Sequence, residues 1–232
     1  MDLNNCGFRG ELPSTLANLS KLGFLSFSYN NFQGIIPQWI TNFTNLFLLD
    51  LSDNDFNGSI PYDLERLQGF AIHQFYFFEL YFQTKEYIKG IEYNLSYILI
   101  INAIFDLFGN NLSREIPKSI GNMRSLALLN FSGNQLEGKI PASFSEIPTL
   151  EQLDLSKNNL DGAIPQELSQ LSMLAYLDVS SNNLCGPIPG GTQFYTFNES
   201  SFQRNKCLCG YPLPGCSKKI YEDNQWRQWQ SK

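Results

Sequence analysis

Side chains that can do chemistry are few in this 232-residue chain, which contains one histidine and five cysteines. The histidine, His73, stands alone in a non-repeating segment and is more typical of a structural or solvated residue than of a catalytic one. Carboxylates recur at Asp50, Asp154 and Asp178, but they recur because a whole segment repeats, and this does not make an acid–base pair. No phosphate-binding glycine loop, nucleophile elbow or metal-ligand pair occurs. The sequence therefore argues against an enzyme, a metal site and a cofactor.

The cysteines are the remaining reactive side chains, and four of them lie in the last 50 residues: Cys185, Cys207, Cys209 and Cys216. Zinc is the alternative to disulfides, but Cys-x-Cys followed by one more cysteine, without histidine, is poor zinc spacing. Disulfides in an oxidising compartment are therefore favoured, and four cysteines permit three pairings.

A 24-residue repeat covers most of the chain and must determine where these side chains lie. The copies LGFLSFSYNNFQGIIP from Leu22 and LEQLDLSKNNLDGAIP from Leu150 share the template LxxLxLSxNxLxGxIP, and further copies begin at Leu46, Leu126 and Leu174. A partial first copy from Leu3 puts Cys6 at the asparagine position, where we expect a buried free thiol. The template asparagines are Asn30, Asn54, Asn110, Asn134, Asn158 and Asn182.

Each letter of the template has a structural role. The leucines alternate inward along a short strand, and the asparagine is expected to turn inward and bond backbone groups of adjacent coils. The glycine permits a turn with positive φ, and Ile-Pro gives an extended return. Because no single coil can close a core, seven coils would stack into a solenoid of parallel β strands with irregular or 3-10 return segments, roughly 34 Å long.

The repeat spacing is broken once, because Asn54 and Asn110 are 56 residues apart and so enclose about 32 extra residues. We expect three N-terminal repeats at 1–69, the first of them partial, a non-repeat insertion at 70–101, four repeats at 102–189, a cap at 190–216 and a polar tail at 217–232. The insertion is rich in aromatic residues, and its TKEYIKGIEYNLSYILI segment alternates like a strand. Its aromatics either pack against the solenoid or contact a ligand, for which the better candidates are Lys85, Tyr87, Lys89 and Tyr93.

Template x positions on the strands are expected to point out of the concave face of the solenoid. Aromatic residues there suggest recognition of a protein or peptide, although scattered surface aromatics are also common without a function. The candidates for concave-face contacts are Phe24, Tyr29, Phe47, Glu151, Gln152, Lys157 and Tyr176.

Asn-x-Ser/Thr sequons occur seven times, where chance predicts about three, although the template itself generates some of them. Only 16% of the residues are charged, and glycosylation would help to keep such a surface soluble. The net charge of −6, without a basic face, argues against nucleic-acid binding. The sequons are Asn18, Asn42, Asn57, Asn94, Asn111, Asn130 and Asn198.

The Leu-x-Gly-x-Ile-Pro segments resemble plant-type extracellular leucine-rich repeats, over roughly Leu3 to Pro61 and Asp106 to Cys216. The segment GGTQFYTFNESSFQRNKCLCGYPLPGC is similar to the C-terminal cap of plant receptor-like proteins and of polygalacturonase-inhibiting proteins. An insertion followed by four final repeats resembles receptor-like proteins in particular. The resemblance of the cap implies the disulfides Cys185–Cys207 and Cys209–Cys216.

This resemblance implies the ligand-recognition region of a receptor-like protein in defence or developmental signalling, on the extracellular side of the plasma membrane. The implied partners are an extracellular peptide, protein or glycan and a co-receptor kinase at the last four repeats. The chain shows no signal peptide or membrane helix. It also lacks the cysteine-paired N-terminal cap of the family, which predicts aggregation of the isolated chain. The alternatives are a soluble inhibitor of microbial cell-wall-degrading enzymes, disfavoured by the insertion, and a truncated non-functional product.

Overall fold

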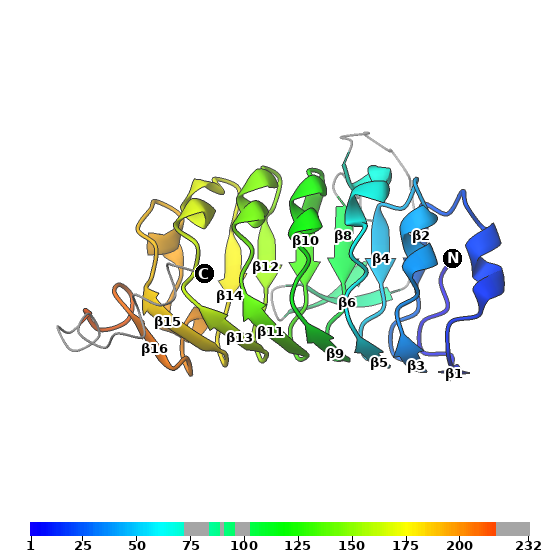
Figure 1. Cartoon of the computed structure of the whole chain (residues 1–232), viewed down its shortest axis with the longest axis horizontal. Coiled ribbons are helices and arrows are strands. Elements are labelled where there is room, and N and C mark those ends of the chain that lie inside the picture. Colours follow the sequence, from blue (N-terminus) through cyan, green and yellow to red (C-terminus); the bar gives the residue numbers. More distant parts are fainter. Residues whose placement is uncertain (72–83, 89–90, 96–102, 217–232) are drawn as a thin grey trace.

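The chain forms a solenoid whose coils stack along its long axis (Figure 1). The structure is a computed structural model that describes residues 1–71, 84–88, 91–95 and 103–216. The N-terminal coil lies at one end of the stack, and the disulfide-bonded cap lies at the other (Figure 1). Side chains from each coil fill one continuous apolar core between two parallel sheets.

Six short parallel strands form the first sheet. The middle residue of the β4 triplet, Leu49, is fully buried, as are its register neighbours Leu25 and Phe105, so alternate residues face the core. Strand β4 pairs directly with β8, so the interruption of the repeat does not interrupt the sheet. In spatial order the strands are β2 (Phe24–Ser26), β4 (Leu48–Asp50), β8 (Ala103–Asp106), β10 (Leu126–Asn130), β12 (Gln152–Asp154) and β14 (Tyr176–Asp178).

The return side of each coil is more regular than the sequence predicts, because it carries a second parallel sheet of eight strands. Most of these strands follow a template asparagine and include or end close to the template glycine, which has positive φ, for example Gly138 and Gly162. In β9 the corresponding residue is Arg114, which also has positive φ (72°). The strands are β1 (Arg9–Gly10), β3 (Asn31–Ile35), β5 (Asp55–Gly58), β9 (Asn111–Arg114), β11 (Gln135–Lys139), β13 (Asn159–Gly162), β15 (Asn183–Pro187) and β16 (Cys207–Cys209).

Short 3-10 helices complete the coils. Five of them begin directly after the template proline, which has extended backbone, as at Pro141 (φ −65°, ψ 129°), and no N–H to pair with a neighbouring strand. The helices are η1 (Ser14–Asn18), η2 (Gln38–Asn42), η3 (Leu64–Arg66), η4 (Gln68–Phe70), η5 (Lys118–Asn122), η6 (Ala142–Glu146) and η7 (Gln166–Gln170), with η8 (Phe194–Thr196) and η9 (Glu199–Ser201) in the cap.

The template asparagines are buried and form a ladder between coils. Asn158 shows the pattern: its Oδ1 accepts the amide of Leu136 in the preceding coil (2.9 Å), and its Nδ2 donates to the carbonyls of Phe131 (3.0 Å) and Leu155 (3.2 Å). Asn205 extends the ladder into the cap, where it accepts the Leu184 amide at 3.0 Å. The sequence reading missed Asn205 because it follows Asn182 by 23 residues rather than 24 and lacks the leucine template.

The side chain of Cys6 is exposed, so the expected burial of this thiol is wrong. Its backbone does take the ladder position, since the Cys6 amide donates to Asn30 Oδ1 at 3.1 Å. The side chain stays at the surface because coil one has a neighbouring coil on one side only, as β1 at the edge of its sheet shows. The thiol is free, as expected.

The insertion leaves and rejoins the solenoid at one point. The amide of Ser125 donates to the carbonyl of Phe70 (2.8 Å), and the amide of Ala103 donates to the carbonyl of Ser125 (3.0 Å). Phe70 is buried in the core, 5.9 Å from the ring of Phe105. Between these anchors, β6 (Thr84–Ile88) and β7 (Ile91–Leu95) form an antiparallel hairpin, in agreement with the alternating pattern of that segment.

Candidate ligand-binding surface

Two columns of side chains line the outer face of the six-stranded sheet, which is the side opposite the core. The first column is apolar over four strands and polar over the last two. The second is almost entirely acidic or amide. In strand order the first column is Phe24, Leu48, Ile104, Leu128, Gln152 and Tyr176, and the second is Ser26, Asp50, Asp106, Asn130, Asp154 and Asp178.

The recurring carboxylates of the second column have a structural role that the sequence reading did not identify. Asp154 Oδ1 accepts the amide of Ser156 two residues later (3.0 Å), and Asp178 Oδ1 accepts that of Ser180 (2.8 Å). Asn130 makes the same bond to the Ser132 amide at 3.1 Å, so an amide oxygen serves as well as a carboxylate. Each of these turns ends a strand and aims the chain toward the next ladder asparagine.

Burial divides the second column into two parts. On β2, β4 and β8, Ser26, Asp50 and Asp106 are only 1%, 2% and 9% exposed. On β10, β12 and β14, the register equivalents are partly exposed. The outer face over β10, β12 and β14 is therefore the more accessible part of the sheet.

Asp154 and Tyr176 form a polar pair on this accessible part. The hydroxyl of Tyr176 donates to Asp154 Oδ2 at 3.3 Å. Burial raises the pKa of Asp154, against the opposing effect of its hydrogen bonds with Ser156, and the nearby charge of Asp178 adds to the increase. Burial, followed by the charges of Asp154 and Asp178, raises the pKa of Tyr176 far above its ordinary value. The phenol therefore remains a hydrogen-bond donor at physiological pH.

The concave-face candidates fall into two separate groups on this surface. Phe24, Gln152 and Tyr176 belong to the first column, while Phe47 and Glu151 directly precede β4 and β12. Tyr29 and Lys157 lie at the corners after the strands, with φ of 54° at each. Strands β8 and β10 separate the N-terminal group from the C-terminal one.

The insertion candidates are only partly within the described residues. Lys85 and Tyr87 lie in β6, Tyr93 and the sequon Asn94 lie in β7, and Lys89 lies outside the described residues. The register pairs Lys85 with Asn94 and Glu86 with Tyr93. Tyr93 is therefore the register partner of neither Lys85 nor Tyr87.

Five of the sequon asparagines are exposed residues outside the six-stranded sheet. Asn18 and Asn42 end η1 and η2, and Asn57 on β5 is the register partner of Asn111 on β9. Asn198 is exposed in the cap and accepts the Ser200 amide at 3.0 Å. Asn130 differs, because its Nδ2 donates to Asp106 Oδ2 at 3.3 Å while its Oδ1 holds the turn at Ser132.

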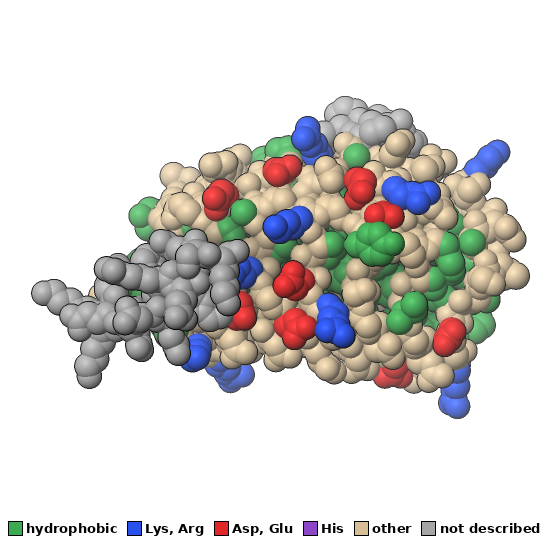
Figure 2. Space-filling view, viewed as in Figure 1, with side chains coloured by type: hydrophobic (Ala, Val, Ile, Leu, Met, Phe, Trp, Pro, Cys, Tyr) green, Lys and Arg blue, Asp and Glu red, His purple; other side chains and the backbone are tan. Residues whose placement is uncertain are grey.

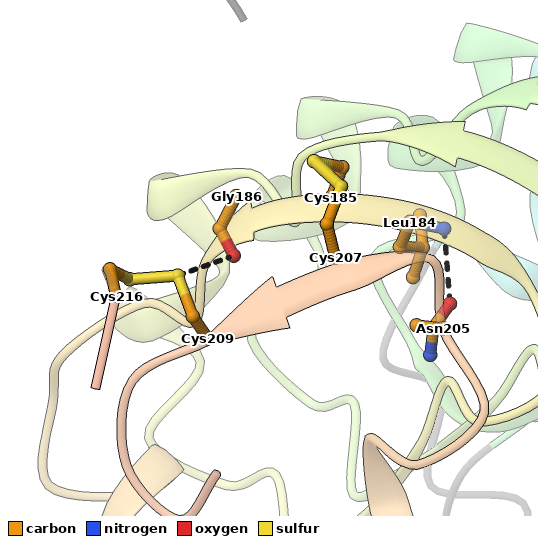
Figure 3. The surroundings of a disulfide bond; sticks show 7 residues. All are labelled: Leu184, Cys185, Gly186, Asn205, Cys207, Cys209 and Cys216. Carbon is orange, nitrogen blue, oxygen red and sulfur yellow. Dashed lines mark hydrogen bonds between the residues drawn. A yellow bond between two sulfur atoms is a disulfide. The ribbon is translucent and has the colours of Figure 1, made fainter. Parts of the chain in front are cut away.

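The C-terminal cap contains the two disulfides implied by the sequence resemblance, Cys185–Cys207 and Cys209–Cys216. Figure 3 shows the first joining adjacent strands β15 and β16, where the two cysteines are register partners. The same figure shows Asn205 bonded to the Leu184 amide beside it. Over the described part of the chain, no group of His, Cys, Asp and Glu is placed to hold a metal ion.

Profiles described as leucine-rich repeat match residues 1–19, 21–43, 45–67, 104–123 and 125–147, and a second such profile matches residues 140–184. No curated protein is similar enough to count as a match. Among solved structures, the chain is similar to the leucine-rich repeat ectodomain of the Arabidopsis receptor kinase HAESA in complex with an IDA peptide hormone (31% identity, TM-score 0.69). It is also similar to the plant peptide hormone receptor RGFR1 in complex with RGF2 (29%, TM-score 0.67).

A further structure contains Arabidopsis HAESA with the hormone IDA and the co-receptor SERK1 (28% identity, TM-score 0.57). The three matches cover 90%, 89% and 90% of this chain but only 29%, 28% and 34% of the other chains. This chain therefore spans about a third or less of the length of those structures. The matched repeats and the solenoid together show that the chain belongs to the leucine-rich repeat family, with repeats of the type found in plant receptor ectodomains.

Proposed function

We propose that this chain is the extracellular ligand-recognition region of a plant receptor-like protein that acts in defence or developmental signalling. It performs no catalysis and signals through a co-receptor kinase. The observation that carries the proposal is the similarity of 90% of the chain to an ectodomain solved with its peptide hormone. The two disulfides fit the oxidising environment of an extracellular domain. Within the described residues, no helix is long and apolar enough to cross a bilayer.

The ligand in this proposal is a peptide, protein or glycan held by the outer face of the six-stranded sheet and by the insertion. Lys85, Tyr87, Lys89 and Tyr93 are the proposed contacts of the insertion. The co-receptor docks at the last four repeats, which contain β8 to β15. Glycans at the exposed sequons keep the charge-poor surface soluble without covering the accessible part of the outer face.

The experiment uses the chain secreted from plant cells and the ectodomain of SERK1 as the probe. Peptides from apoplastic fluid are captured on the immobilised chain, identified by mass spectrometry, synthesised, and titrated by interferometry. We expect at least one of them to bind and to promote association with the SERK1 ectodomain. If no captured peptide binds or recruits SERK1, the proposed function is wrong.

Variants then locate the binding surface. Lys85→Ala with Tyr87→Ala is expected to weaken binding of the captured peptide by about tenfold, because two contacts of roughly 0.7 kcal/mol each are lost. Glu65→Ala with Arg66→Ala, in exposed η3, is the matched control and is expected to leave affinity unchanged. Equal affinities in the two double variants would remove the insertion from the binding site.

A further inference from the structure

We propose that the outer face over β10, β12 and β14 binds a basic segment of an extended peptide, with an arginine or lysine side chain contacting Tyr176, Glu151 and Asp178. This inference rests on the proposed function and specifies the chemistry of its ligand.

The carboxylates of the second column are accessible to a ligand on β12 and β14 but not on β4 and β8. Asp50 and Asp106 are buried, and Asp50 also accepts the hydroxyl of Ser26 at 2.8 Å. Asp154 and Asp178 are partly exposed, as are Gln152 and Tyr176 in the first column. A ligand side chain therefore reaches carboxylates on β12 and β14 without displacing buried groups.

The carboxylates of this region differ in how many of their oxygens already accept hydrogen bonds. Asp154 is bonded through both oxygens, to the Ser156 amide and to the Tyr176 hydroxyl. Asp178 bonds the Ser180 amide through Oδ1, and its Oδ2 has no partner among residues 1–71 and 103–216. Glu151, which directly precedes β12, likewise has no side-chain partner in those ranges. Two partly exposed carboxylates are thus left to meet a cation.

Tyr176 adds an aromatic face to these charges. It lies two residues before Asp178 on the same face of β14, so the Cα atoms of the two residues are roughly 7 Å apart along the strand. The hydrogen bond to Asp154 fixes the direction of the phenol. A guanidinium over such a ring gains cation–π attraction while its planar fork bonds a carboxylate.

Among residues 103–216, Lys157 and Arg204 lie to one side of the carboxylates. Lys157 and Arg204 both occupy corners with positive φ, Lys157 after β12 and Arg204 in the cap. The strands themselves carry Glu151, Asp154 and Asp178 at or beside their ends and no Lys or Arg. The strip over β12 and β14 is therefore negative, which favours a basic ligand over an acidic one.

The test uses a fluorescein-labelled dodecapeptide of Gly, Ser and Pro with three arginines, and the same peptide with citrulline at those positions. Citrulline has nearly the shape of arginine but no charge. Dissociation constants are measured by fluorescence anisotropy on the full chain at low and high salt. We expect the arginine peptide to bind about fivefold more tightly at low salt, with the preference reduced at high salt. Equal affinities for the two peptides would overturn the inference.

The decisive variant is Glu151→Gln with Asp178→Asn, which removes charge while keeping shape. Asn130 already shows that an amide oxygen can hold the turn at this column position, so the strand should keep its geometry. We expect about a fivefold loss of affinity for the arginine peptide and no change for the citrulline peptide. Glu137→Gln with Asp161→Asn, on the second sheet, makes the same charge change and should alter affinity less than twofold.

The outcomes separate this inference from the proposed function. An equal loss in both double variants would show a nonspecific effect of net charge and contradict the inference. If a captured apoplastic peptide recruits SERK1 but has no basic residue, the inference fails and the proposed function stands. If the arginine peptide binds as expected but no apoplastic peptide recruits SERK1, the proposed function fails.

Discussion

At the scale of single residues, the ladder asparagines do more for the fold than any other polar group. Asn158 accepts one amide and donates to three carbonyls, including that of Ser156 at 3.1 Å. These backbone groups lie between adjacent coils, and the asparagine that binds them is itself buried. Buried polar groups without partners are costly, and one side chain here satisfies several of them.

Asn158→Ala is therefore expected to lower the free energy of unfolding by about 3 kcal/mol, since it leaves buried amide and carbonyl groups unpaired. Urea denaturation followed by circular dichroism measures the change. The adjacent residue provides a matched control, because Asn159 is exposed and Asn159→Ala should change stability by less than about 0.5 kcal/mol. Similar effects of the two substitutions would contradict the role given to the ladder.

Sequence reasoning identifies such residues when the template surrounds them and fails where it does not. The six asparagines at template positions were predictable, since leucines at fixed offsets place each one after an inward-facing strand. Asn205 was not, because the three leucine positions before it hold Phe197, Ser200 and Phe202. The burial of Cys6 was predicted wrongly, because spacing alone does not show that a coil has a neighbour on one side only.

At the scale of elements, the insertion interrupts a coil whose two parts, before and after it, otherwise form one normal repeat. Phe70 lies 24 residues after Leu46 and is buried at the same position of the repeat. Ala103 then takes the next position of the repeat, which Phe47 holds after Leu46 in the preceding coil. Both ends are held by the backbone of Ser125. Removing the 32 residues 71–102 would reduce the step between Asn54 and Asn110 from 56 to 24 residues, which is the normal repeat.

We therefore expect the deletion of residues 71–102 to fold, with a melting temperature within a few degrees of that of the full chain. The direct pairing of β4 with β8 already supplies the sheet across the junction. Calorimetry and size-exclusion chromatography measure the outcome. A deletion that also removes Ala103 shortens β8 and should be clearly less stable, because the chain must then reach Ile104 with one residue fewer. An unfolded 71–102 deletion would show that the insertion is part of the core.

Element prediction was accurate for the strands that carry leucines and incomplete for the return side. The inward leucines predicted the six-stranded sheet, and alternation predicted strand in the insertion hairpin. The second sheet was not foreseen, because its strands hold at most one large buried apolar side chain each, such as Leu160 in β13, and a period of two cannot be recognised from one residue. The candidate contacts were likewise predicted as a set, whereas the structure separates them into two groups.

At the scale of the whole molecule, the two ends of the stack differ. The cap closes the C-terminal end with Phe194, Phe197 and Phe202, a final ladder asparagine and two disulfides. The first coil instead exposes Phe8 and Leu19, at 42% and 40%. Between the ends, the visible surface is mostly uncharged, with isolated charged side chains (Figure 2). Stability in such a stack is a sum of coil–coil contacts, so loss of structure is expected to begin at an end.

The disulfides of the cap should therefore control how the C-terminal end opens. Cys185–Cys207 joins residues 22 apart, and Cys209–Cys216 joins residues 7 apart. Loop-closure entropy gives about 3 kcal/mol for the first and somewhat less for the second. Cys185→Ser with Cys207→Ser also removes the covalent link between β15 and β16, beside the hydrogen bond from the Leu184 amide to Asn205. We therefore expect a lower melting temperature, measured by calorimetry, and fast amide exchange in β16 that spreads to β15, measured by hydrogen-exchange mass spectrometry. Cys209→Ser with Cys216→Ser is the control and should leave the amides of β15 protected. Rapid exchange of β15 in the control variant alone would contradict the prediction that Cys185–Cys207 holds β16 and β15 together.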